Sequence, residues 1–457
     1  MNEMITPTEW VTCTIGDVCA LNPKAQLSDD LDIGFMPMAG MPTSYFGDCR
    51  FEARKWSNAK KGFTQFRDND VVFAKITPCF ENSKAAIIKG FPNEWGAGST
   101  EYYVLRPYSG LVRPELLYAV IKSKKFMING ALNMSGSVGH KRVPKDFVSG
   151  YEFTLPPLAE QKVIADRLDT LLAQVESTKA RLERIPEILK RFRQSVLAAA
   201  VSGGLTKKLS ATDWKKTTIG EVALEIRYGT SKKCSELTSG TPVLRIPNVG
   251  DGFVVKNKLK FAEFDLGEIR KLELKPGDLL LVRSNGSLDL VGKTALVKDG
   301  DAGFVFAGYL IRLRLDAEVA NPAYISIFLR SPEARAAIEE KAKSTSGVNN
   351  INSKELASLC LKLPVVDEQT EIVRRVDQLF AYADTVERQV NSALERVNQL
   401  TQSILAKAFR GELTAQWRED NPALISGENS AEALLERIKA ERAAQTPKKR
   451  TKKKASA

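Results

Sequence analysis

The chain of 457 residues carries a formal net charge of +12, with 43% hydrophobic and 27% charged residues. This composition is typical of a soluble globular protein with two or three domains. No apolar run approaches the roughly 18 residues of a membrane span, and the N-terminus lacks a signal-peptide pattern, so we expect a cytoplasmic protein.

The excess of positive charge makes nucleic acid the expected polyanionic partner. Part of that excess lies in the tail after Pro447, KKRTKKKASA, which contains no acidic residue and is predicted to be disordered. The six cysteines are scattered without a Cys-x-x-Cys pair, which favours free, buried thiols over a metal site.

Residues 1–155 contain short apolar runs, such as VVFAKI and YYVLR, that Gly, Pro and Asn separate. Such runs predict strands joined by turns, so we expect a mixed α/β domain here. A long helical pattern follows over residues 156–206. Residues 207–363 and 364–414 repeat this order of domain and helix. Residues 415–457 form a C-terminal segment with a short helix and the basic tail.

The two halves of the chain are copies of one unit. The segment WVTCTIGDVCAL at Trp10 matches WKKTTIGEVALE at Trp214, and LPPLAEQKVI at Leu155 matches LPVVDEQTEI at Leu363. Further on, SVLAAAVSGGLT matches SILAKAFRGELT. The offset is 204 residues at the start and 208 in the later segments. An internal repeat of this kind indicates two similar domains, each followed by its own helix.

Each helical pattern carries an apolar seam with alternating steps of four and three residues, a heptad repeat that predicts a coiled coil. Two such seams in one chain most simply bury each other. The predicted seam positions are Ile164, Leu168, Leu171, Val175, Leu182, Leu189, Phe192 and Val196 in the first helix, and Ile372, Val376, Leu379, Val386, Val390, Val397, Leu400 and Ile404 in the second.

The sequence also predicts where these helices end and where one of them is interrupted. Gly203 and Gly411 stand where a C-terminal cap is expected, so we predict that the helices end there. Pro186 lies within the first seam and has no counterpart in the second. Because proline lacks an amide hydrogen and clashes with the preceding turn, we expect the first helix to be kinked at this point.

The predicted fold class is therefore α/β (α+β), with two mixed α/β domains, two long helices in an antiparallel coiled coil and a pseudo-two-fold internal repeat. Antiparallel helices would place the domains at opposite ends of a rod. Such an arrangement matches a DNA site with two half-sites separated by a spacer of fixed length. Since the two domains differ in sequence, we expect the two half-sites to differ.

The two helical segments and the sequence NPALISGENSAEALLERIKAERAA also carry a family resemblance. They resemble the conserved regions of the specificity subunits of type I restriction-modification enzymes, most closely the enteric K-type (type IA) group. These segments cover about a third of the chain. The rest fits the family layout, in which two variable target-recognition domains are each followed by a conserved helix.

The resemblance implies a non-catalytic subunit that binds double-stranded DNA at a split site. It implies assembly with two methyltransferase subunits, and with two restriction/translocase subunits for cleavage. The complex would methylate adenines in half-methylated sites and cut unmethylated DNA after ATP-driven translocation. S-adenosylmethionine, ATP and Mg²⁺ would then be bound by the partner subunits and not by this chain.

Motifs for a catalytic function are weak or missing in the sequence. Val291 to Thr294 resemble the end of a phosphate-binding loop, but position 287, where that loop needs glycine, is Ser287. His140 is the only histidine, which excludes metal sites with several histidines. Neither an N-P-P-Y motif nor a G-x-G-x-x-G motif occurs. A strand and turn is the better interpretation of residues 291–294.

Candidate DNA contacts come from basic and amide side chains in and near predicted turns. Lys75 and Arg283 occupy the same place in the two copies, just after a strand, and suit a grip on the phosphate backbone. The loop at 137–142 and its counterpart at 346–350 combine Gly with Asn, Arg and Lys, which suits entry into a groove. The candidates are Arg54, Lys60, Lys61, Lys75, His140, Lys141, Arg142, Arg245, Lys256, Arg283, Ser284, Asn285, Asn349 and Asn350.

Each of these assignments has a plainer alternative. A charged residue at a strand end is often only solvated, and a Gly-rich polar loop is often a simple turn. At the level of the whole protein, the alternative is a coiled-coil adapter whose flanking domains bind proteins. DNA binding that weakens steeply with salt would favour the specificity subunit over the adapter.

Overall fold

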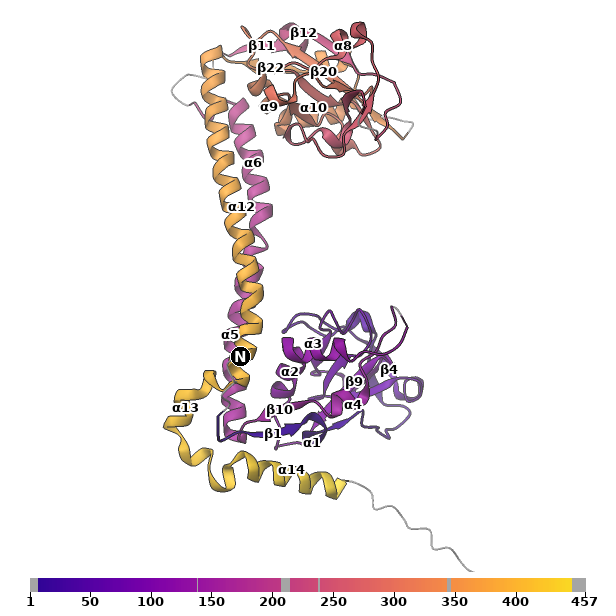
Figure 1. Ribbon diagram of the computed structural model, residues 1–457, viewed down its shortest axis with the longest axis vertical. Helices are drawn as coiled ribbons and strands as arrows, with labels where there is room; N and C mark the ends of the chain where they lie inside the picture. Colours follow the sequence, from indigo (N-terminus) through magenta and orange to yellow (C-terminus); the bar gives the residue numbers. More distant parts are fainter. Residues whose placement is uncertain (1–6, 138, 207–213, 237–238, 343–346, 446–457) are drawn as a thin grey trace, which may run out of the picture. The chain divides into compact units, whose positions relative to one another are not determined.

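The computed structural model describes residues 7–137, 139–206, 214–236, 239–342 and 347–445. These residues form two compact units (Figure 1), the first built from parts of residues 1–183 and 393–457 and the second from parts of residues 184–392. The predicted disordered tail after Pro447, Val138 and Ser346 lie outside the described residues. Within the described residues, no helix is long and apolar enough to cross a membrane.

The first unit contains two four-stranded sheets with strand orders β2-β9-β6-β7 and β4-β3-β8-β5, and a two-stranded sheet β1-β10. Its elements are β1 (Val11–Thr14), α1 (Ile15–Val18), β2 (Cys19–Leu21), β3 (Asp32–Met36), β4 (Glu52–Lys55), β5 (Thr64–Arg67), β6 (Val71–Ala74), β7 (Ala85–Ile87), β8 (Trp95–Gly98), β9 (Tyr102–Pro107), α2 (Pro114–Lys122), α3 (Lys124–Leu132), α4 (Lys145–Ser149), β10 (Glu152–Leu155), α5 (Leu158–Leu182), α13 (Ala415–Asp420) and α14 (Ala431–Gln445).

The second unit contains a five-stranded sheet β12-β20-β16-β18-β14, a three-stranded sheet β15-β13-β19, and the pairs β11-β22 and β17-β21. Its elements are α6 (Ile185–Val201), β11 (Lys215–Thr218), α7 (Ile219–Val222), β12 (Ala223–Tyr228), β13 (Thr241–Leu244), β14 (Gly252–Phe253), β15 (Lys260–Ala262), α8 (Leu266–Leu272), β16 (Leu279–Val282), β17 (Ser284–Asn285), β18 (Thr294–Leu296), β19 (Val305–Phe306), β20 (Leu310–Leu315), α9 (Pro322–Arg330), α10 (Pro332–Ala342), β21 (Asn349–Asn350), α11 (Ser353–Ala357), β22 (Cys360–Leu363) and most of α12 (Val366–Phe409).

The strand pairings explain why the repeat offset drifts near its start. In the first unit Cys19 pairs with Pro107 and Leu21 with Leu105. In the second unit Ala223 pairs with Leu315, but a β-bulge follows before the pairing resumes at Glu225. One extra residue in the bulged strand shifts the numbering by one. The difference in offset therefore arises partly at this bulge, within an otherwise repeated sheet.

The predicted interruption of the first long helix is confirmed. Helix α5 ends at Leu182 and α6 begins at Ile185, with Pro186 in the first turn of α6, where its missing amide hydrogen costs no helical hydrogen bond. The second helix, α12, runs without a break from Val366 to Phe409. Gly203 and Gly411, just beyond α6 and α12, have φ angles of 81° and 73°, as the predicted C-terminal caps require.

Within each unit, α12 lies beside a helix of the first repeat (Figure 1). In the second unit the guanidinium of Arg193 on α6 lies 2.7 Å from Asp384 and 2.8 Å from Glu387, while Arg375 donates to the backbone oxygen of Leu205. The chain numbers rise along one helix as they fall along the other, so these two segments are antiparallel.

Most predicted seam residues are buried or half-buried in the structure. The buried ones are Ile164, Leu168, Val175, Leu189, Val196, Ile372, Val376, Val390 and Val397, and the half-buried ones are Leu171, Leu182, Phe192, Leu379, Val386 and Ile404.

The assignment of Leu400 to the seam is wrong, because this side chain is 46% exposed. The buried face of α12 continues instead through Leu405 and Ala408, which belong to the core of the first unit. At this end α12 packs on the α/β domain as well as on α5: Gln402 accepts from the backbone of Lys124 and donates to the backbone oxygen of Lys122. This additional packing turns the buried face away from the strict heptad.

A buried polar cluster, repeated in both units, fastens each domain to the helices. In the first unit Glu160, 0% exposed, accepts from the indole of Trp10 at 2.8 Å and the hydroxyl of Thr414 at 2.5 Å. In the second unit Glu368 accepts from Trp214 at 3.2 Å and Thr206 at 2.7 Å.

The threonine in each cluster comes from the other repeat. Thr414 follows the second long helix but binds the carboxylate of the first repeat, and Thr206 follows the first long helix but binds the carboxylate of the second. Neither unit is therefore complete without the end of the other copy.

The six cysteines form no disulfide, as predicted, but they are not uniformly buried. Cys13 and Cys19 are buried, whereas Cys360 is exposed. Cys360 opens β22, in which exposed and buried residues alternate, so its side chain faces solvent.

Candidate DNA interface

One central strand in each unit is held at its start by a carboxylate and carries a cation just past its end. Asp70 precedes β6 and binds Arg106 in a bidentate pair at 2.8 and 2.7 Å. Asp278 precedes β16 and binds Arg314 in the same way at 2.7 Å. Two fixed hydrogen bonds on each carboxylate set the position of the strand.

In the first unit the far end of this strand meets the loop that the sequence singled out. Lys75 follows β6. Its backbone amide donates to the backbone oxygen of Glu101, and its carbonyl accepts from the backbone amide of Val143, at 2.9 Å each. Ile76 forms an isolated bridge with Arg142. The strand end and the loop at 137–142 are thus neighbours, although sequence reasoning considered them separately.

The second unit builds the same arrangement with different side chains. The amide of Arg283 donates to Tyr309 and its carbonyl accepts from Ile351, at 2.9 Å each. Ser284 pairs with Asn350 and Asn285 with Asn349, forming the two-stranded sheet β17-β21. We call Lys75, Glu101 and Arg142, and their counterparts Arg283, Tyr309 and Asn350, the strand-end surfaces of the two units.

The electrostatics of the two strand-end surfaces differ. In the first unit the guanidinium of Arg142 binds the carboxylate of Glu101 at 2.7 and 2.9 Å. Hydrogen bonds from Arg142, with a smaller contribution from the charge of Lys75, hold the pKa of Glu101 below its ordinary value. In the second unit the corresponding position is Tyr309, which is 64% exposed. One surface therefore offers an ion pair where the other offers an uncharged aromatic ring.

Arg283 is held by an aromatic ring and an amide. Its guanidinium carbon lies 4.4 Å from the centroid of Tyr228, and its Nε donates to the side-chain oxygen of Asn350 at 3.2 Å. A guanidinium over a ring is stabilised electrostatically and keeps its remaining donors in a fixed plane. Such a group suits a phosphate or a guanine edge.

A groove of about 660 Å³ in the second unit brings Arg283 together with Arg245, Lys232 and Lys260. Tyr228 and Tyr309 also line it, and none of the described residues that line it is acidic. Cations interleaved with aromatic rings in a groove are typical of nucleic-acid binding surfaces.

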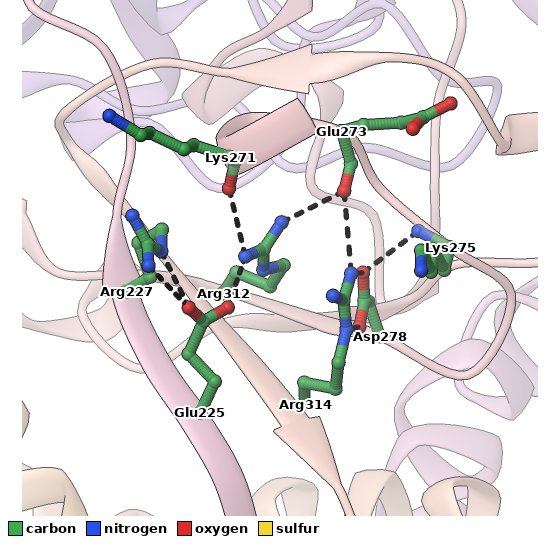
Figure 2. A network of polar contacts seen from close by, with 8 residues as sticks. All are labelled: Glu225, Arg227, Lys271, Glu273, Lys275, Asp278, Arg312 and Arg314. Atoms are coloured by element: carbon green, nitrogen blue, oxygen red, sulfur yellow. Dashed lines mark hydrogen bonds and ion pairs between the residues drawn. The ribbon is translucent and has the colours of Figure 1, made fainter. Parts of the chain in front are cut away.

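A buried ion network supports the strand that carries Tyr228 (Figure 2). Arg312, 1% exposed, binds the carboxylate of Glu225 and donates to the backbone oxygens of Lys271 and Glu273. Burial by itself would raise the pKa of Glu225, but hydrogen bonds from Arg227 and Arg312 hold it below its ordinary value. The network ties β12 to β20 and to the C-terminal end of α8.

The pair of Glu225 and Arg312 has no counterpart at the aligned positions of the first unit, whereas the pair of Asp278 and Arg314, also drawn in Figure 2, does. The strand register places Ala20 and Val104 where the second unit has Glu225 and Arg312. The two domains therefore share a backbone plan while their interiors differ, which is expected if each is free to vary around common helices.

Two of the remaining predicted contacts are already engaged by other side chains. Arg54 stacks on Phe35 at 3.6 Å and pairs with Glu52, and Lys60 pairs with Asp29 at 2.7 Å.

Lys61, His140 and Lys141 are exposed, and the last two belong to the loop beside Arg142. Lys256 pairs with Asp301 at 3.0 Å and lies in the segment between β14 and β15. The positive φ of Lys258, 52°, forces the chain to turn there.

Tyr228, Tyr309, Lys232 and Glu101 were not predicted as candidates. The repeat offset that aligned Lys75 with Arg283 also aligns Glu101 with Tyr309, so the signal was present. Tyr228 carries no such signal, because its place in the groove depends on the bulged pairing of β12.

The comparisons with known proteins identify the family. The family described as "Type I restriction modification DNA specificity domain" matches residues 7–187 and 211–396, well over half of the chain. The chain belongs to this family. Its members supply DNA sequence specificity to type I restriction-modification systems, and the names of its relatives indicate a non-catalytic subunit.

Two similar curated proteins are the type I restriction enzyme EcoKI specificity subunit of Escherichia coli (strain K12) and the StySPI specificity subunit of Salmonella potsdam. The first is 49% identical over 358 residues, which cover 76% of this chain and 77% of the relative. The second is 44% identical over 357 residues, with the same coverage.

Solved structures share the fold at lower identity. The HsdS subunit from Thermoanaerobacter tengcongensis superposes with a TM-score of 0.62 at 21% identity, covering 89% of this chain and 98% of that one. A chain from the structure "Structural basis underlying complex assembly and conformational transition of the type I R-M system" gives a TM-score of 0.65 at 21% identity, with 89% and 99% covered.

The phosphate-loop resemblance at residues 291–294 is explained by the fold. Thr294 opens strand β18, and Gly292 occupies the turn before it with a φ of 77°. A phosphate-binding loop leads into a helix, so this segment is the strand and turn that the sequence favoured. Within the described residues, no group of three or more His, Cys, Asp or Glu side chains could hold a metal ion.

Proposed function

We propose that each unit of this DNA specificity subunit recognises one half of a split, asymmetric DNA site through its strand-end surface. The long helices would set the spacer and dock two methyltransferase subunits, and the complex would direct adenine methylation and, with two restriction/translocase subunits, cleavage. S-adenosylmethionine, ATP and Mg²⁺ would be bound by those partners.

One observation carries the proposal of two different half-sites. The backbone contacts of Lys75 and Arg283 are the same, bond for bond, while their neighbours change from Glu101 and Arg142 to Tyr309 and Asn350. Contacts with the phosphate backbone position a protein on DNA, whereas side chains at the base edges specify the sequence. Recognition of two unequal half-sites requires this combination of a common backbone arrangement and different side chains at the surface.

Methylation mapping tests this function directly. The chain would be expressed with its cognate methyltransferase in a methylation-free host, and methyladenine positions would be sequenced across the genome. We expect one motif with two specific parts and a spacer of fixed length. A continuous motif, or none, would contradict the proposal.

Exchange of residues 1–155 for the corresponding domain of another family member supplies the control. Only one half of the motif should change, while the other half and the spacer length stay the same. A change in both halves would show that the domains do not act separately.

A further inference from the structure

A cavity of the first unit lies at the other end of β6 from the strand-end surface. It has a volume of about 690 Å³ and is lined by the start of β6, the end of β9, the first turns of α2 and α5, and the C-terminal segment. We call it the C-terminal cleft. Its lining residues include Arg67, Asp68, Asp70, Glu94, Arg106, Arg113, Lys162, Leu424, Asn429 and Arg437.

The C-terminal cleft has an excess of unpaired positive charge. Of its three carboxylates, Asp70 is bound by Arg106, and Asp68 accepts from the backbone amides of residues 90 and 91. Arg67, Lys162 and Arg437 are exposed and form no ion pair within the described residues. Three unpaired cations in one concave surface outnumber the two carboxylates without an ion-pair partner there, Asp68 and Glu94, and this excess favours an anionic ligand.

The corresponding face of the second unit carries less positive charge. The alignment of the two faces is secure, because the side chain of Gln161 accepts from the amide of Arg113 and that of Gln369 accepts from the amide of Asn321. The second unit keeps a cation at the position of Arg67, where it has Lys275, but it has Thr370 for Lys162, Glu318 for Gly110 and Asp367 for Ala159.

The segment that forms one side of the cleft follows only one of the two long helices. Leu424, Asn429 and Arg437 come from the segment after the second long helix, and Leu434 and Ile438 of α14 are fully buried in the core of the first unit. The first long helix is followed directly by the second domain, so the second unit has no such segment. A ligand of the cleft therefore binds once per chain.

The position and lining of the cleft decide what kind of anion it suits. Asp70 and Lys75 flank opposite ends of β6, about 17 Å apart at about 3.3 Å per residue, so the cleft and the strand-end surface are separate sites on this strand. None of the described residues that line it is aromatic, and it therefore offers no platform for a nucleobase. Apolar side chains such as Leu424 also line the cleft and suit a peptide.

We propose that the C-terminal cleft docks one acidic peptide segment of a partner subunit in the assembled complex. The cations would pair with its carboxylates, and the single copy of the cleft would make this contact asymmetric in a chain whose helices are repeated. The site is distinct from the DNA surfaces, and its existence does not depend on which sequence the two domains recognise.

Site-specific cross-linking in the purified complex of the full chain, its methyltransferase and its translocase tests the proposal. Ser109, an exposed residue of the cleft, is replaced by p-benzoylphenylalanine, and Ala317, its counterpart in the second unit, serves as the control. We expect irradiation to join position 109 to one peptide rich in Asp and Glu, identified by mass spectrometry, and position 317 to none. Cross-links from position 109 to DNA only, or to no partner, would overturn the proposal.

Charge reversal provides a second arm with matched controls. The double variant Lys162→Glu, Arg437→Glu should weaken assembly on the order of tenfold, measured by native mass spectrometry across a concentration series. The conservative variant Lys162→Arg, Arg437→Lys and the second-unit variant Ala317→Glu, at an exposed position outside the long helices, should assemble as the wild type does. Equal assembly of the reversed and conservative variants would overturn the inference. Failure of the wild-type chain to bind any methyltransferase would instead contradict the proposed function, and the cleft proposal with it.

Discussion

The repeated Trp-Glu-Thr cluster gives the sharpest prediction, because the two copies differ in one residue. Glu160 binds Arg418 at 2.6 Å in addition to Trp10 and Thr414. The equivalent position in the first repeat is Ser210, which lies outside the described residues. Glu160→Gln and Glu368→Gln therefore make the same change in two clusters, one with a cation and one where the aligned residue is uncharged.

The expected costs differ by the contribution of that cation. Replacing Glu368 removes charge-assisted hydrogen bonds to two neutral donors, worth about 1.5–3 kcal/mol. Replacing Glu160 also leaves Arg418, with a side chain 14% exposed, without its carboxylate. Removing one partner of a buried pair costs about 3–5 kcal/mol. The first unit should therefore lose about 2 kcal/mol more than the second.

Pulse proteolysis across a urea series measures the free energy of unfolding, and mass spectrometry of the fragments assigns each loss to one unit. The double variant Glu160→Gln, Arg418→Gln completes a double-mutant cycle. Its loss of unfolding free energy should be smaller than the sum of the losses of the two single variants by at least about 1 kcal/mol. Equal losses for the two Glu→Gln variants, together with additive behaviour in the cycle, would refute the reasoning.

Four further predictions follow from other sites. Arg312→Val should destabilise the second unit by about 3 kcal/mol, because it leaves Glu225 without its buried partner. The double variant Arg312→Val, Glu225→Ala, which reproduces the residues of the first unit, should lose much less stability. Equal losses in urea denaturation would contradict the network in Figure 2. Burial raises the pKa of Cys13 to about 12, so its thiolate fraction at pH 8 is negligible. Iodoacetamide should therefore alkylate the exposed Cys360 but not Cys13, and peptide mass spectrometry measures the modification of each. Arg283→Ala should weaken DNA binding and lower the slope of log K against log salt by about 1, a change absent if Arg283 only supports Asn350. Glu101→Gln should alter the first half-site of the methylation motif by about 1–3 kcal/mol per base pair and leave the second unchanged; an unchanged first half-site would remove Glu101 from the interface.

The sequence by itself determined the repeat, the helices and the family. The heptad pattern required two long helices, Pro186 required an interruption in one of them, and Gly203 and Gly411 required their ends, because each of these depends on local backbone chemistry. The matched segments after Leu155 and Leu363 carried the family resemblance without any knowledge of the fold. Lys75 and Arg283 could be paired because they share one offset.

Only the tertiary structure decided which side chains meet. Leu400 was assigned to the seam by periodicity, but the docking of α12 on the domain turned the buried face to Leu405. The neutralisation of Arg142 by Glu101 joins residues that are far apart in the sequence, and so does the stacking of Arg283 on Tyr228. Periodicity reports only which face of an element is apolar, whereas the partner of a polar side chain depends on strand register and on where the ends of two repeats cross.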